Sequence, residues 1–300
     1  MLKSEFISEQ YGKVCLHIWE PDGEVKQLYQ ICHGMSEYVL RYDEFAKRLN
    51  EKGVLVFGID HPGHGESDGV RGFFADKDGW KYLCECNVHA SQIMKERYPD
   101  KKLTLMGHSM GSFVARTIAG YYPDTANEYI FMGTAGPNPA LGVGNALANV
   151  LTLFARRKES NVLYSLSTGP YAKAEKTYKT PFDWLNTVDA EVQNYIDDEN
   201  YGFKFTTAGY RDLFRGLMMI DPKKWAPMLD KSKKYLLVAG DKDPVGDMGK
   251  GVSAVYDAMK EAGVEDTTLI FYEGCRHEIL KDALKEKTMS DIMSFIGLGE

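Results

Sequence analysis

Short runs of hydrophobic residues alternate with longer helical patterns along most of the chain. Residues 54–59 (VLVFGI) form a continuous apolar run of strand length, as expected for a parallel strand that is covered on both faces. Similar runs lie at 103–106, 129–132, 235–239 and 268–272. Helical patterns lie at 42–52, 79–97, 112–122, 249–262 and 279–296. This alternation predicts an α/β fold with a mostly parallel central sheet and helices on both faces.

The beginning of the chain has a different pattern. Apolar runs at 14–19 and 25–31 flank Pro21, Asp22 and Gly23, which are residues that favour a turn. We therefore expect a hairpin at the start of the sheet.

The alternation stops after Gly136 and resumes at Lys234. Residues 137–230 contain helical stretches, many aromatic residues and no convincing buried strand. An excursion of this kind from a sheet edge often covers an active site. We therefore expect a core formed by 1–136 and 231–300 and a helical cap, or lid, formed by 137–230. An insertion that only adds stability would have the same composition, so this alternative stays open.

Composition and charge narrow the class of protein. The 300 residues are 44% hydrophobic and 26% charged, which is typical of a globular protein. The net charge of −7 disfavours a nucleic-acid partner, which normally requires a dense basic face. The chain begins without the apolar run of a signal peptide, and no segment has the roughly 18 uninterrupted apolar residues of a membrane span. Five cysteines with no regular framework indicate reduced thiols, so we expect a cytoplasmic protein.

A nucleophile is predicted at residues 107–111 (GHSMG), which fit G-x-S-x-G. The motif follows the strand pattern 103–106 and precedes a helical pattern, and this is the strand–turn–helix context of a nucleophile elbow. A second match, 65–69 (GESDG), has no strand directly before it and no helix directly after it. The context therefore favours Ser109 over Ser67 as the nucleophile.

A serine hydroxyl needs a base to remove its proton, and an acid to orient that base. In this class of fold the order along the chain is serine, acid, histidine. Of seven histidines, only His277 lies after Ser109. The acid should follow the strand at 235–239, where Asp241 and Asp243 are both eligible. The spacing by itself leaves both carboxylates open.

An oxyanion hole requires two backbone N–H groups near the nucleophile. One is expected from Met110, which follows the serine, and the other from Met35, in the loop after the strand at 25–31.

Together these motifs resemble the α/β-hydrolase superfamily, and within it the monoacylglycerol lipase and lysophospholipase-like serine hydrolases. The matching segments are 33–35 (HGM) with Glu37, Arg41-Tyr42, 60–67 (DHPGHGES), 107–111, Gly240-x-x-Asp243 and Gly274-x-x-His277. The resemblance implies that Asp243, rather than Asp241, is the acid. It also implies an acyl-enzyme on Ser109 and hydrolysis of carboxylic esters of lipid-like substrates such as monoacylglycerols or lysophospholipids. Ser36 and Tyr38 stand where these lipases often have glycine and histidine.

Other functions fit the same residues. The triad serves equally in an aminopeptidase, a thioesterase or an acyltransferase, and a non-catalytic ligand-binding protein of this fold is a further alternative. The mechanism requires no metal or organic cofactor, and the chain has no G-x-x-x-x-G-K-[ST] or G-x-G-x-x-G motif. The expected partner is a small ester or lipid substrate, with transient contact between the cap and a membrane surface.

Overall fold

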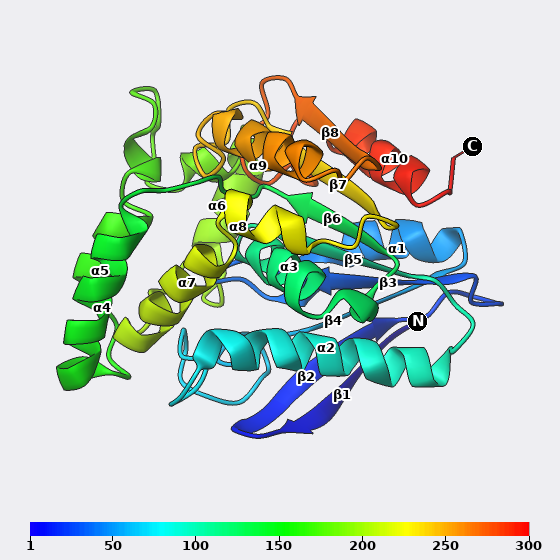
Figure 1. Ribbon diagram of the computed structural model, residues 1–300, viewed down its shortest axis with the longest axis horizontal. Helices are drawn as coiled ribbons and strands as arrows, with labels where there is room; N and C mark the ends of the chain where they lie inside the picture. The colour runs from blue at the N-terminus through cyan, green and yellow to red at the C-terminus, as the bar shows by residue number, and fades with distance from the viewer. Residues whose placement is uncertain (300) are drawn as a thin grey trace.

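The computed structural model describes residues 1–299, whose strands form one eight-stranded sheet (Figure 1). The spatial order of the strands is β1-β2-β4-β3-β5-β6-β7-β8. Strands β3 to β8 are parallel, β2 is antiparallel to β4, and β1 is antiparallel to β2. The bounds are β1 (Leu2–Glu9), β2 (Gly12–Trp19), β3 (Gln27–Cys32), β4 (Val54–Ile59), β5 (Leu103–His108), β6 (Glu128–Met132), β7 (Lys234–Gly240) and β8 (Thr267–Tyr272). The mostly parallel sheet is confirmed.

Helices cover both faces of this sheet because its central strands are apolar on both sides. In β4, Leu55 and Phe57 pack into one apolar cluster, and Val54 and Val56 pack into a second cluster on the opposite face. The first face is covered by α2 (Gly79–Arg97), α3 (Met110–Tyr121) and α9 (Lys250–Glu261). The second face is covered by α1 (Asp43–Glu51) and α10 (Lys285–Phe295). The sequence pattern predicted a helix at 279–296, which is too long, because residues 279–284 form turns before α10 begins.

The predicted hairpin between 14–19 and 25–31 is wrong. Strand β3 lies between β4 and β5 and is parallel to both, whereas the hairpin partner of β2 is β1. The turn of this hairpin lies between Glu9 and Gly12. Strand β1 (LKSEFISE) lies at the edge of the sheet with most of its side chains exposed, so it lacks the continuous apolar run that marks the buried strands.

Residues 137–230 connect β6 to β7. They form α4 (Leu141–Ala155), α5 (Asn161–Ser167), α6 (Asp189–Asp197), α7 (Thr207–Met219) and α8 (Pro222–Trp225). Five short 3₁₀ helices complete the described chain: η1 (Val39–Tyr42), η2 (Pro123–Thr125), η3 (Tyr171–Lys173), η4 (Asp183–Leu185) and η5 (Ala226–Met228). Figure 1 shows α4, α5 and α7 on the side toward which the parallel strands point. Helix α4 packs on α7, and α7 packs on α2 and α3, so this segment contacts the core.

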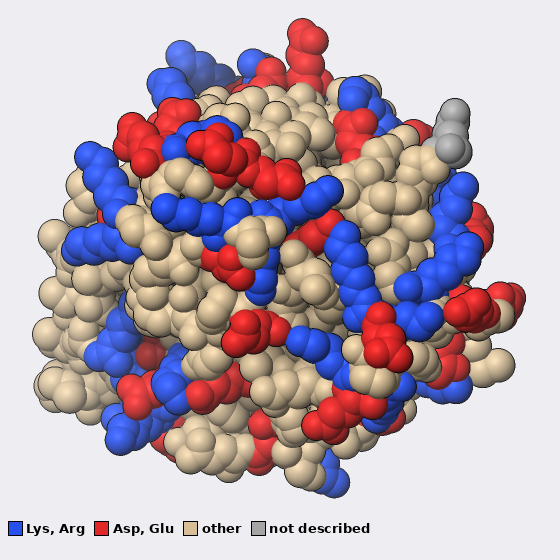
Figure 2. Space-filling view, turned by 45° about the vertical axis from the view of Figure 1, so that its right-hand side comes forward, with Lys and Arg blue, Asp and Glu red and all other residues tan. Residues whose placement is uncertain are grey.

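On the face shown in Figure 2, lysine and arginine side chains are interspersed with acidic ones. Within residues 1–299, none of the helices combines the length and the apolar composition that crossing a membrane requires. The five cysteines, which all lie in this described part, are free and buried.

Candidate active site

Ser109 occupies the turn between β5 and α3 with an unusual backbone conformation. Its φ is 53° and its ψ is −122°, a combination that residues with a Cβ rarely adopt. The backbone N–H of Ser109 donates to the carbonyl of Met132 at 2.9 Å. The predicted strand–turn–helix is therefore present, with Ser109 at the carboxyl end of β5.

The two glycines of the G-x-S-x-G motif are required by close backbone approaches. A Cβ on Gly111 would lie 1.9 Å from the carbonyl oxygen of Cys32, at the end of β3. A Cβ on Gly107 would lie 2.0 Å from the carbonyl oxygen of Gly111. Because the obstructing atoms are backbone, only glycine fits at either position.

The second G-x-S-x-G match lies in a structural loop. The Ser67 hydroxyl donates to the carbonyl of Asp60 at 2.5 Å and accepts from the N–H of Cys15 at 2.9 Å. These bonds fasten the loop after β4 to β2, so Ser67 has a structural explanation.

His277 and Asp243 form a buried pair. Nδ1 of His277 lies 2.8 Å from Oδ2 of Asp243, and the two side chains are 2% and 0% exposed. The other oxygen of Asp243 accepts from the N–H of Val245 at 2.9 Å. Asp241 lies elsewhere, where its carboxylate accepts from the N–H of Gly274 at 2.7 Å. Of the two carboxylates left open by spacing, the structure places Asp243 beside the histidine.

Ser109 and His277 line the same cavity, which has a volume of about 670 Å³. The two residues predicted to form the oxyanion hole, Met35 and Met110, also line it. Most of the remaining wall is apolar or aromatic and includes Phe113, Leu141, Leu147, Tyr171, Trp184, Phe214 and Leu217. Four of the five predicted site residues thus meet at one cavity, and the fifth, Asp243, is buried behind His277.

The loop that carries Met35 passes beside Ser109. A Cβ on Gly34 would lie 3.2 Å from the Cβ of Ser109. In the same loop, Ser36 has a φ of 55°. The hydroxyl of Ser36 donates to the carbonyl of Phe203 at 2.6 Å. Its own carbonyl accepts from the N–H of Gly202 at 3.0 Å. This loop is therefore hydrogen-bonded to the helical segment 137–230.

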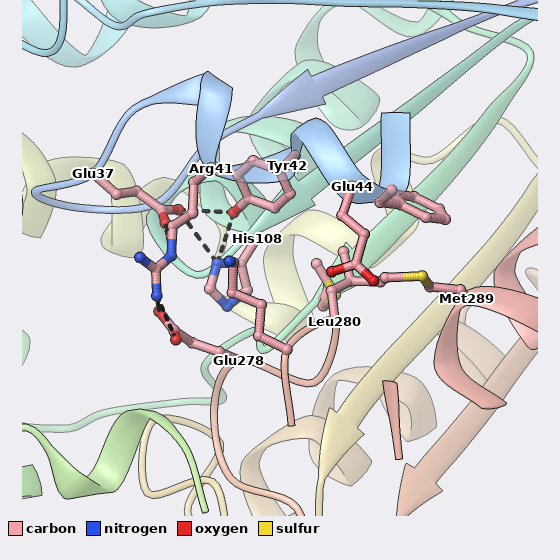
Figure 3. A pocket seen from close by; sticks show the side chains of 11 residues that line it. Glu37, Arg41, Tyr42, Glu44, His108, Glu278, Leu280 and Met289 are labelled. Carbon is pink, nitrogen blue, oxygen red and sulfur yellow. Dashed lines mark hydrogen bonds and ion pairs between the residues drawn. The ribbon is translucent and has the colours of Figure 1, made fainter. Parts of the chain in front are cut away.

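A cluster of buried charged groups lies beside the loop that carries Met35 (Figure 3). No motif in the sequence predicts this cluster. Arg41 donates to both carboxylate oxygens of Glu278, at 2.7 and 2.6 Å, and its Nε lies 3.4 Å from Glu37. The imidazole of His108 lies on the other side of Glu37. The four residues are 3–9% exposed and surround a small cavity of about 30 Å³. Glu37 and Arg41 were visible as motif matches, but no local pattern links them to a residue more than 200 positions away.

The electrostatics of this cluster favour its charged forms. Burial disfavours the ionised form of Glu37, but His108, Arg41 and the Tyr42 hydroxyl outweigh it and lower the carboxyl pKa to about 2. Burial disfavours the charged form of His108, but Glu37 and Glu278 outweigh it and raise the imidazole pKa above its ordinary value. The cluster therefore holds its charges by mutual compensation.

One group of side chains has the composition of a metal site. Ligand atoms of Cys15, His17 and Glu66 lie within 4.8 Å of one another. However, the two ring nitrogens of His17 are already engaged, by Ser4 at 2.8 Å and by Asp60 at 3.1 Å. Burial and the Asp60 charge also raise the pKa of the Cys15 thiol to about 12, which disfavours the thiolate that a metal binds. These residues fit a structural hydrogen-bonded group better than a metal site.

The strand order and the serine at the carboxyl end of β5 place the protein among the α/β-hydrolases. Residues 23–283 match the family model described as serine aminopeptidase, S33, and the chain belongs to that family. Its relatives include monoglyceride lipase from Homo sapiens, which is 30% identical over 276 residues that cover 91% of this chain and 82% of the relative. Monoacylglycerol lipase from Mycolicibacterium smegmatis is 26% identical, and the match covers 95% of this chain and 92% of that relative.

A carboxyl esterase from Bacillus coagulans, solved in complex with glycerol, superimposes with a TM-score of 0.93. Its identity is 26%, and the match covers 98% of this chain and 97% of that one. Together with the relatives above, this structure identifies the protein as a carboxylic ester hydrolase.

Proposed function

We propose that the protein hydrolyses esters of lipid-like substrates, such as monoacylglycerols or lysophospholipids, through an acyl-enzyme on Ser109. The observation that carries this proposal is the His277–Asp243 pair, because its histidine lines the cavity that also exposes Ser109. A strained serine, a histidine and a carboxylate in this order are the components of a nucleophilic triad.

In the proposed mechanism, Oγ of Ser109 attacks the ester carbonyl carbon while His277 removes its proton. Because Nδ1 of His277 faces Asp243, the other ring nitrogen is the one that exchanges protons with the serine and the substrate. The N–H groups of Met35 and Met110 stabilise the oxyanion. His277 then protonates the departing alcohol, and the same imidazole activates the water that hydrolyses the acyl-enzyme. Asp243 stays ionised throughout, and no cofactor takes part.

A lipid-like substrate is supported by the cavity and by the relatives. The wall of the cavity is mainly apolar, and its volume suits a ligand with a hydrocarbon chain. Several relatives are named for monoglycerides or monoacylglycerols. Residues 137–230 supply much of this wall, which supports their role as a cap over the site.

The cap also carries exposed apolar side chains that suit a lipid surface. On α4 and α5 the large apolar side chains that are exposed are Val143, Val150, Leu153, Phe154, Val162 and Leu166. Val143 and Leu166 also line the cavity, so the apolar surface is continuous with the site. This continuity supports transient contact with a lipid aggregate or membrane surface, from which a substrate would enter.

Labelling with a fluorophosphonate, followed by mapping of the modified peptide, tests the nucleophile. We expect a single label on Ser109. In Ser109→Ala the label should be lost, and turnover should fall by a factor on the order of 10⁶. The matched control is Ser67→Ala, which removes the serine of the other motif and should keep the label. Labelling at another residue, or ordinary turnover in Ser109→Ala, would contradict the proposal. Absence of any label would favour the non-catalytic alternative.

A substrate panel tests the substrate class. Esters of increasing acyl length, a matching thioester and a peptide are compared by kcat/KM. We expect esters with medium or long acyl chains to exceed acetyl esters, because the long chains fill the apolar cavity. A profile that does not change with chain length argues against a lipid substrate. A preference for the peptide would assign the aminopeptidase activity in the family's description to this chain.

A further inference from the structure

Both ring nitrogens of His108, the residue before the proposed nucleophile, face hydrogen-bond acceptors. Nε2 lies 3.2 Å from the carbonyl oxygen of His277. Nδ1 lies 2.9 Å from the hydroxyl of Tyr42 and 3.4 Å from Oε1 of Glu37. The side chain is 5% exposed, so bulk water does not replace these partners.

The Tyr42 hydroxyl does not supply a proton to His108, because Glu37 takes it. The hydroxyl oxygen lies 2.8 Å from Oε1 of Glu37 and donates to it. An ionised carboxylate only accepts, so the hydroxyl proton points toward Glu37 and the hydroxyl oxygen accepts from the imidazole. A neutral imidazole has one N–H, whereas this arrangement requires one on each nitrogen.

The charges around His108 lead to the same conclusion. Glu37 and Glu278 each contribute a negative charge, and Arg41 contributes one positive charge. The other titratable groups near the ring are Tyr42 and His277, with Glu44 and Lys281 at the edge of the small cavity. Without a proton on His108, the buried cluster of Glu37, Arg41 and Glu278 keeps an uncompensated negative charge, which is costly in a buried site.

We propose that His108 is a positioning residue that acts as an imidazolium and joins the loops on either side of the nucleophile. Its Nδ1 side holds Glu37, whose Oε1 also accepts from the N–H of Gly34, next to Met35. Its Nε2 side holds the backbone of His277. The ion pairs described above raise the pKa of His108 and so support this geometry. The consequence for catalysis rests on the proposed function, whereas the charge state of His108 does not.

Loss of the His108 proton removes one of its two N–H donors, so one of the two loops is released. Both loops carry groups that act in the transition state, the Met35 N–H and the His277 imidazole. Deprotonation should therefore lower kcat and leave KM nearly unchanged.

NMR of the protein labelled with ¹⁵N-histidine tests the charge state directly, with His108→Gln used to assign the signal. We expect both ring nitrogens of His108 to show protonated chemical shifts at pH 7. The same spectrum in Ser109→Ala should be unchanged, so the result does not depend on turnover. A spectrum with one unprotonated nitrogen at pH 7 overturns the proposal.

The pH dependence of kcat tests the positioning role. Glutamine does not titrate, and its single amide nitrogen cannot take the place of both Nδ1 and Nε2 as donors. His108→Gln should therefore lower kcat by up to about 10²-fold, keep KM, and lose the decline at high pH that follows His108 deprotonation. The matched control is His89→Gln, because His89 pairs with Glu9 on the partly exposed surface of α2. An unchanged kcat in His108→Gln would overturn the positioning role. An inactive wild type would instead refute the proposed function, and the NMR result would still stand.

Discussion

Oδ2 of Asp243 lies 2.8 Å from Nδ1 of His277, whereas Asp241, two residues earlier, binds the N–H of Gly274. The carboxylate at 243 can therefore orient the imidazole and stabilise its positive charge, but the carboxylate at 241 cannot. We predict that Asp243→Asn lowers kcat/KM by roughly 10⁴-fold. Asp241→Asn removes the same charge from the same loop and should stay within a few-fold of wild type. Steady-state kinetics on one ester decide the matter, and the opposite ranking would assign the acid to Asp241.

The close approach of Gly111 to Cys32 predicts a large loss of stability in Gly111→Ala. The new methyl group would lie 1.9 Å from a backbone carbonyl oxygen, so β3 or α3 must shift. We expect the free energy of unfolding to fall by about 3 kcal/mol or more, measured by urea denaturation. Gly142→Ala is the matched control, because its added Cβ, on the exposed side of α4, has nothing within 4 Å beyond its chain neighbours and the backbone of its own helix. That variant should be unchanged or more stable by up to about 1 kcal/mol. Equal effects of the two substitutions would show that the motif glycine is not sterically required.

The lowered pKa of Glu37 predicts a specific loss of stability in acid. A carboxyl group whose pKa is about 2 in the folded state, compared with an ordinary 4.5, stabilises the fold above pH 4.5. This contribution, of about 3 kcal/mol, is lost as the pH falls from 4.5 to 2. In Glu37→Gln the free energy of unfolding should therefore depend less on pH in this window than it does in wild type.

The control for this measurement is Glu261→Gln, which removes an exposed carboxylate at the end of α9. Its pH dependence should follow that of wild type. If Glu37→Gln also follows wild type between pH 4.5 and 2, then Glu37 is not held ionised by its neighbours.

The difference between what the sequence could and could not predict follows the range of the interactions. The position of Ser109 in a strand–turn–helix was predictable because motif 107–111 and the strand and helix patterns that flank it are local in the sequence. His277 was selected because the order of the triad left one histidine, and its catalytic role stays a prediction. The pairing of β2 with β1 was missed because an exposed edge strand has no apolar run. The cluster of Glu37, His108, Arg41 and Glu278 was not predictable, because its contacts depend on the packing of loops from distant parts of the chain.

The proposed contact with a lipid surface predicts a role for the exposed side chains of Leu153 and Phe154. They are 77% and 84% exposed at the end of α4, so replacing them should not disturb the core. If each contributes about 1 kcal/mol by partial burial in lipid, Leu153→Glu with Phe154→Glu should weaken vesicle binding roughly thirtyfold. Hydrolysis of a dispersed monoacylglycerol should fall as well, whereas hydrolysis of a dissolved short-chain ester should not change. Sedimentation with phosphatidylcholine vesicles measures the binding.

The control is Phe6→Glu, on β1, which makes the same chemical change at another exposed aromatic residue and should bind like wild type. If vesicle binding falls equally in Phe6→Glu and the double variant, or in neither, then the apolar face of α4 has no specific role at a lipid surface.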